Sequence, residues 1–314
     1  MLGIVRTDEG SGPEKRAPLL EPDLAARVQR IRVRTHRLVT TALSGGYRST
    51  FRGQGLEFSE VRAYQPGDDV RRIDWNVTAR MGEPFIKSYA EERELSIELV
   101  VDTSRAMDFG TRLRTKREAA AQFSALISFV ALRNQDRVGL LLFGDQPGLH
   151  LRARKGSSHV LRIVREVLAA RPSAGGGGLG VALEHTERTL RRRSVVFVVG
   201  DFIGANTWVD PMRRLSIRHD VIAVRITDPL ERELPRAGLV EFQEVGTGRR
   251  LEIDTDSKRV RDHWRACAED RRRRTNEDLA RARADVIDLD AGGELGEPVA
   301  TFFRRRVARK GVSR

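Results

Sequence analysis

Five short apolar segments constrain the fold of this chain more than any other feature. They are LSIELVVD at 95–102, RVGLLLF at 137–143, SVVFVVGD at 194–201, DVIAVRITD at 220–228 and ADVIDLD at 284–290. Continuous apolar segments of this length are typical of parallel strands that are buried on both faces. We therefore predict an α/β fold with a doubly wound, mostly parallel sheet.

The stretches between these segments favour helices, because their apolar residues recur at helical spacing. One such helix carries Phe123, Leu126, Ile127 and Val130 on one face, and others are expected near 157–170, 179–192 and 207–218. Beyond Pro229, the pattern predicts a hairpin over 239–254, a long helix over 257–284 and a short one near 298–309.

The first 94 residues have a different pattern. Residues 1–21 are interrupted by charges, glycine and proline, and we interpret them as a flexible extension. An amphipathic entry helix begins at 22, and short segments broken by glycine with scattered aromatic residues follow to 94. We predict a small β-rich lobe over 22–94, and the α/β domain over 95–314.

The longest apolar stretches fall well short of the ~20 residues that a membrane-spanning helix needs. The N-terminus also lacks the apolar run of a secretory signal, so we expect a cytoplasmic protein. The single cysteine, Cys267, excludes an intrachain disulfide and a multi-cysteine metal site.

The net charge is +13, and only six of the 57 basic residues are lysine. Clusters of arginine can neutralise the phosphates of nucleic acid, so a nucleic-acid-associated protein is one alternative. The 44 acidic residues are interspersed, however, and no group of aromatic residues accompanies the arginines. This pattern favours a salt-bridged surface. The arginine clusters are 191–193, 271–274 and 304–306.

Three predicted strands end in aspartate, namely Asp102, Asp201 and Asp228, and Ser104 lies two residues beyond the first. Ligands of open α/β sheets bind at the carboxyl ends of strands. Carboxylates and hydroxyls there could supply the oxygen ligands that Mg²⁺ prefers. The other interpretation is that they cap helices and stabilise turns, which we favour for Asp228 because Pro229 follows it.

The segment DTSRA at 102–106 resembles the metal-ion-dependent adhesion site of von Willebrand factor A domains. The resemblance implies metal ligation by Asp102, Ser104 and Asp201. Ala106 stands where the family has a second serine, and Gly177 where it has a threonine. The resemblance therefore implies a degenerate site, at which any Mg²⁺ would be bound weakly.

A second resemblance covers residues 53–94, which are similar to the hallmark of the bacterial domain-of-unknown-function family fifty-eight. Members carry this segment fused to a von Willebrand A-like domain, and the resemblance implies partnership with a MoxR-type AAA+ ATPase and its client proteins. The matching positions include Glu57, Arg62, Tyr64, Gly67, Asp68, Arg71, Asp74, Trp75, Arg80 and Arg93. They could form the core and salt-bridge lattice of the lobe, anchored by Tyr64 and Trp75, or a recognition surface.

Several catalytic templates do not fit the sequence. The glycines at 175–178 are not followed by the Lys and Ser/Thr of a phosphate-binding loop, and neither a G-x-S-x-G nor an H-E-x-x-H motif occurs. We predict a non-enzymatic protein-interaction or adaptor protein that acts with a MoxR-type ATPase. The alternatives are a nucleic-acid-associated basic protein and a metal-dependent hydrolase.

Overall fold

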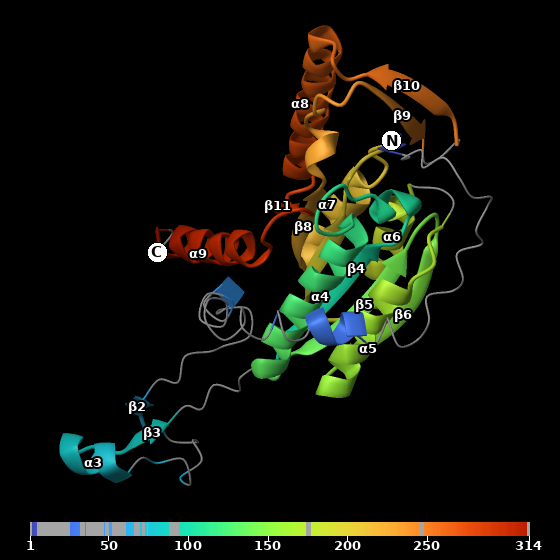
Figure 1. The fold of residues 1–314 in the computed structure, drawn as a ribbon. Helices are drawn as coiled ribbons and strands as arrows, with labels where there is room; N and C mark the ends of the chain where they lie inside the picture. Colours follow the sequence, from blue (N-terminus) through green and yellow to red (C-terminus); the bar gives the residue numbers. More distant parts are fainter. Residues whose placement is uncertain are drawn as a thin grey trace.

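The computed structural model describes residues 2–4, 26–31, 35, 47, 50–51, 61–65, 70, 73, 75–87, 94–173, 177–244 and 248–312. Its centre is a six-stranded sheet of order β11-β8-β7-β4-β5-β6 (Figure 1). Every neighbouring pair is parallel except β5 and β6, which confirms the predicted mostly parallel sheet. The strands are β4 (Ser96–Asp102), β5 (Arg137–Phe143), β6 (Pro147–Arg154), β7 (Val195–Gly200), β8 (Asp220–Thr227) and β11 (Asp285–Asp290).

Helices cover both faces of this sheet, as a doubly wound fold requires. Alternate residues of β4 point to opposite faces, so Leu99 packs in one hydrophobic cluster and Val100 in the other. The first cluster includes residues of α4, α5 and α9, and the second includes residues of α6, α7 and α8. These helices are α4 (Lys116–Arg133), α5 (Ser157–Ala169), α6 (Leu179–Thr189), α7 (Val209–Arg218), α8 (Lys258–Arg281) and α9 (Gly296–Val312).

The edge strand β6 was not predicted from the sequence. It pairs antiparallel with β5 through an irregular register, and most of its residues are at least partly exposed. An exposed edge strand does not need the continuous apolar run that identified its neighbours. Strand β6 therefore adds an antiparallel edge to the parallel sheet.

A separate three-stranded sheet contains the predicted hairpin. Strands β9 (Leu239–Glu244) and β10 (Arg250–Asp254) pair antiparallel, and β1 (Leu2–Ile4) pairs with β9. Residues 2–4 of the predicted flexible extension are thus a strand, and its remaining residues lie outside the described part of the chain.

The described residues of 22–94 do not show a β-rich lobe. They include two three-residue strands, β2 (Val61–Ala63) and β3 (Phe85–Lys87), which pair antiparallel, and the helix α3 (Trp75–Met81). Residues 26–31 and 35 are helical, in agreement with the predicted entry helix.

Part of this N-terminal region belongs to the core of the α/β domain. The rings of Tyr47 and Phe51 are buried and lie 5.9 Å from the ring of Phe303 on α9. The Tyr47 hydroxyl donates to Asp136 Oδ2 at 2.9 Å, and the Arg27 guanidinium lies 2.7 Å from Glu118 on α4. Among the helices that the structure describes, none has the length and apolar composition needed to cross a membrane.

Candidate functional site

The structure brings Asp102 and Asp201 together at the carboxyl ends of two adjacent strands. Asp102 is the last residue of β4, and Asp201 follows the last residue of β7, which is parallel to β4. Gly200 leaves room beside Asp102, because a Cβ at that position would make a tight contact of 3.3 Å with the Asp102 Cβ. Directly after Asp201 the backbone of Phe202 takes a left-handed conformation with φ of 54°, which turns the chain away from the strand.

Ser104 lies beside Asp102, as the sequence predicted. Its backbone N–H donates to Asp102 Oδ1 at 2.7 Å, and the side chain is buried. The short helix η3 (Arg105–Asp108) begins directly after it. A parallel bridge joins Ser104 to Ser173, which lies in the loop after α5. Ser173 carries a hydroxyl, whereas Gly177, at the position of the family's threonine, has no side chain. Ser173 was missed because it lies outside the motif spacing.

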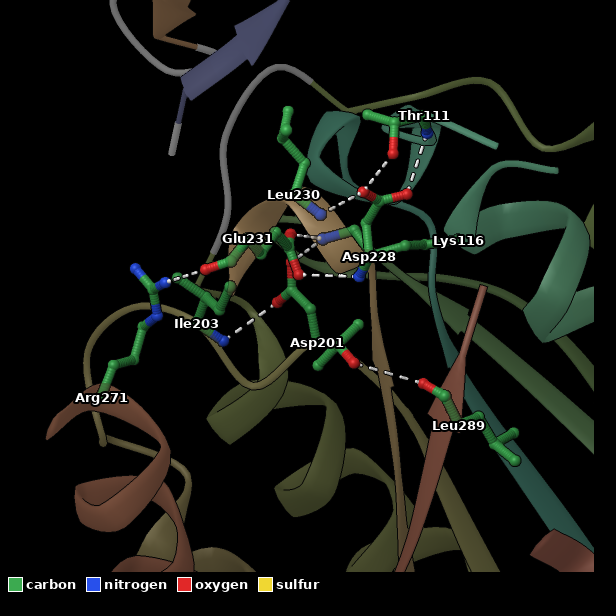
Figure 2. A network of polar contacts seen from close by, with 10 residues as sticks. Thr111, Lys116, Asp201, Ile203, Asp228, Leu230, Glu231, Arg271 and Leu289 are labelled. Atoms are coloured by element: carbon green, nitrogen blue, oxygen red, sulfur yellow. Dashed lines mark hydrogen bonds and ion pairs between the residues drawn. The ribbon is translucent and has the colours of Figure 1, made fainter. Parts of the chain in front are cut away.

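A residue that the sequence analysis missed, Lys116, lies at the centre of the site. Its Nζ is 2.8 Å from Asp201 Oδ2 and 2.7 Å from Glu231 Oε1 (Figure 2). The Lys116 side chain has no exposed surface, and those of Asp201 and Glu231 are 5% and 10% exposed. One buried ammonium therefore joins the end of β7 to η4 (Pro229–Glu231), the short helix that follows β8.

Lys116 is the first residue of α4, which Thr115 caps through a reciprocal pair of hydrogen bonds with Glu118. A cation at this end of a helix is disfavoured by the helix dipole. The two carboxylates offset that cost. The next residue, Arg117, holds the loop that follows β4. Its Nε lies 2.6 Å from Asp108, and its Nη2 donates to the Thr103 carbonyl at 3.1 Å.

Burial and charge shift the pKa values of these groups. Burial alone would lower the pKa of Lys116, but Asp201 and Glu231 outweigh it and raise that pKa, so the ammonium stays charged. Burial raises the pKa of Glu231, although Lys116 opposes the shift. Burial and the nearby charge of Asp201 raise the pKa of Asp102 to about 7.

Asp228 performs the capping role favoured for it. Its carboxylate is fully buried, accepts the Leu230 N–H at 2.9 Å and caps η4. The same carboxylate accepts both the backbone N–H and the hydroxyl of Thr111. The Asp228 N–H in turn donates to Glu231 Oε2 at 3.1 Å, which orients Glu231 toward Lys116 (Figure 2).

The donor set around Asp102 and Asp201 does not fit the predicted Mg²⁺. Asp201 Oδ2 already accepts a hydrogen bond from a buried ammonium, and that fixed positive charge would repel a divalent cation at the same oxygen. The described residues also contain no group of three or more His, Cys, Asp or Glu side chains arranged to hold a metal ion. The Lys116 ammonium thus provides, at Asp201, the positive charge that a metal ion would otherwise supply.

One sequence signal could have drawn attention to Lys116. The chain uses arginine for nearly all of its basic residues, and Lys116 is one of six lysines. A buried position that must fit between two carboxylates favours the compact ammonium of lysine over the larger, planar guanidinium. Glu231 had no comparable signal.

The second group of predicted residues, the signature segment, lies partly outside the described residues. Arg62 is in β2, and the Tyr64 backbone N–H donates to the Pro84 carbonyl at 2.7 Å. Arg80 is exposed in the last turn of α3. Trp75, expected to anchor a lobe, is 70% exposed, so that expectation is wrong. Glu57, Gly67, Asp68, Arg71, Asp74 and Arg93 lie outside the described residues.

Comparison with protein families gives one match that covers most of the chain. A family model described as "Protein of unknown function DUF58" matches residues 60–274. The uncharacterized protein Rv1480 of Mycobacterium tuberculosis is 34% identical over 255 residues, which cover 81% of this chain and 80% of that protein. The uncharacterized protein Mb1516 of Mycobacterium bovis matches to the same extent.

Two solved structures resemble this one more weakly. The protein BatB of Bacteroides thetaiotaomicron has 12% identity and a TM-score of 0.47, covering 68% of this chain and 99% of that chain. The VWA domain of SpRpn10 has 12% identity and a TM-score of 0.36, covering 68% of this chain and 95% of that chain.

Proposed function

Since this chain belongs to the DUF58 family, we propose that it is a non-enzymatic adaptor that acts in the cytoplasm with a MoxR-type AAA+ ATPase and its client proteins. The observation that carries the proposal is the buried contact of Lys116 with Asp201 and Glu231. These carboxylates lie where an open α/β sheet binds its ligands. Both carboxylates are held in ion pairs with Lys116 and have a structural role. This arrangement favours a binding surface over a catalytic centre.

The internal ion pairs also give this end of the sheet a fixed shape. Lys116 holds α4, the end of β7 and η4 together, and Arg117 holds the loop after β4. A preorganised surface loses little conformational entropy when a partner binds. This rigidity suits an adaptor that presents one surface to an ATPase.

Two of the three arginine clusters, 271–274 and 304–306, favour a salt-bridged surface over a nucleic-acid interface. On α8, Arg273 lies 3.2 Å from Glu277, and Arg274 lies 2.7 Å from Asp270. On α9, Arg304 lies 2.6 Å from Glu297. Paired arginines have less charge available for phosphates.

The test is capture of a purified MoxR-type ATPase from the same organism by the immobilised chain. We expect capture without nucleotide that persists in a chelator, because the Lys116 ammonium replaces the metal. Capture that the chelator abolishes, or no capture in any nucleotide state, contradicts the proposal.

Trp75 allows the signature segment to be tested in the same experiment. An exposed tryptophan is a frequent anchor of protein interfaces. Trp75→Ala should weaken capture while leaving the thermal unfolding midpoint unchanged, because the side chain is 70% exposed. The matched control is Ile217→Ala on α7, which is 74% exposed and should have no effect on capture.

A further inference from the structure

An arginine-rich cleft opens beside the Lys116 site. Its volume is about 1060 Å³, and it lies between α8 on one side and η4 with the following loop to 236 on the other. Asp201 and Ile203 line its inner end, and Thr111 and Arg112 approach from the loop before α4. The cleft therefore lies at the carboxyl ends of the strands, where this class of sheet binds ligands.

The cleft carries an excess of positive charge. Eight arginines line it, against four carboxylates. Two of those carboxylates, Asp201 and Glu231, already pair with Lys116, and two of the arginines, Arg232 and Arg265, already pair with Asp290 and Glu233. Arg112 and Arg236 are exposed and make no ion pair with any residue that the structure describes. Arg271 donates to the Glu231 backbone carbonyl at 3.1 Å (Figure 2). This acceptor is neutral, so the contact does not balance the charge of the guanidinium.

The wall of the cleft also has more positive than negative charge at Arg225, which is buried. A single carboxylate, Asp288, pairs through Oδ1 with Arg225 Nε at 2.7 Å and through Oδ2 with Arg272 Nη2 at 2.9 Å. Arg225 is 5% exposed, and its Nη1 has no hydrogen-bond partner among the described residues. Two guanidinium charges thus share one carboxylate, and an anionic ligand in the cleft would offset the remaining charge.

The length of the cleft indicates what kind of anion fits. The α8 wall runs from Arg261 to Thr275, a rise of about 21 Å, which is the length of about six residues of extended chain. Leu230, Leu234 and Ala268 lie between the arginines but are only 7%, 2% and 8% exposed, so they add little apolar surface to the cleft. A single phosphate would leave most of this length empty, whereas an extended chain with several acidic groups would reach arginines along the whole wall.

We propose that this cleft binds an extended acidic peptide segment of a partner protein, with its carboxylates on the arginines. Arg112, Arg236 and Arg271 would take the carboxylates, because they lack carboxylate partners of their own among the described residues. This inference rests on the proposed adaptor function and names the chemistry of the segment that the adaptor recognises.

The test is fluorescence anisotropy of the full chain with a fluorescein-labelled peptide of alternating glutamate and leucine. The same peptide with glutamine in place of glutamate should bind much more weakly. Arg236→Glu and Arg271→Glu should each raise the Kd for the acidic peptide by about tenfold or more, because each removes a charge-assisted hydrogen bond and adds a repulsion. Arg165→Glu, on α5 and 61% exposed, is the matched control and should leave the Kd unchanged.

Several outcomes would overturn the proposal. They are equal affinity for the two peptides, equal weakening by Arg165→Glu, and tighter arginine-dependent binding of a single-stranded oligonucleotide. Arg112→Gln, a milder change at an exposed residue, provides a second folded variant that should also weaken peptide binding. The assay contains no ATPase. Peptide binding without ATPase capture would thus contradict only the partnership, and capture without peptide binding would contradict only the cleft.

Discussion

Lys116→Met should destabilise the protein strongly, because it removes the ammonium and leaves two carboxylates buried without a counter-charge. Lys116 Nζ lies within 2.8 Å of both Asp201 and Glu231, and all three side chains are at most 10% exposed. Breaking a buried ion pair by removing one partner costs about 3–5 kcal/mol. That is a large part of the total stability of about 5–15 kcal/mol typical of a folded domain.

Urea unfolding followed by circular dichroism measures this loss. The matched control is Lys258→Met on α8, whose side chain is 82% exposed beside Asp262. We expect a much smaller loss there, because solvent screens an exposed pair. The destabilisation of Lys116→Met should also shrink as the pH falls. Burial raises the pKa of Glu231 and the variant lacks the ammonium that opposes this shift, so the folded variant takes up a proton at Glu231 and gains stability as the pH falls.

The triple variant Lys116→Met, Asp201→Asn, Glu231→Gln separates lost charge from lost packing. Neutral side chains of similar shape need no counter-ion, so the triple variant should recover most of the stability lost in the single one. Added Mg²⁺ should raise the unfolding midpoint of Lys116→Met and leave that of the wild type unchanged. A triple variant as unstable as the single one, or a wild type that Mg²⁺ stabilises equally, would refute the reasoning.

Three further predictions concern the same end of the sheet. Asp228→Ala should cost about 2–4 kcal/mol in urea unfolding, because it removes a helix cap and leaves buried donors unpaired; a loss near zero would contradict the capping role. The pKa of Asp102 is raised from 3.8 to about 7, so its contribution to the unfolding free energy falls as pH rises between these values, by up to about 1.4 kcal/mol per pH unit. Asp102→Asn should flatten that slope, and an unchanged pH profile would contradict the shift. Gly178→Ala should lower the thermal unfolding midpoint, because its Cβ would lie 2.2 Å from the Gly144 carbonyl oxygen, and an unchanged midpoint would show that the backbone can move.

The parallel part of the sheet could be predicted because its strands are buried on both faces and have continuous apolar sequences. The five predicted segments correspond to β4, β5, β7, β8 and β11. Strand β6 was missed because its residues are largely exposed. The contact of Tyr47 and Phe51 with α9 was also missed, since no local pattern shows which distant helix an aromatic residue will meet.

The candidate site was predictable to the same limited extent. Asp102, Ser104 and Asp201 were identified because strand ends can be read from the sequence. Lys116 is the first residue of α4, and Glu231 is the last residue of η4. Their contact with Asp201 depends on how these elements are arranged in three dimensions. The sequence therefore placed Asp102, Ser104 and Asp201 at one edge of the sheet as a degenerate site, but did not predict that Lys116 and Glu231 join Asp201 there.

The covalent attachment of this positive charge has a consequence for regulation. A site that depends on a dissolved ion fills and empties with the supply of that ion, and chelators can switch it off. Here the effective concentration of the counter-ion is set by the fold and does not vary with growth conditions. The ion pairs themselves can instead be changed by a proton, by a covalent modification of Lys116 or by a partner that competes for Asp201 or Glu231.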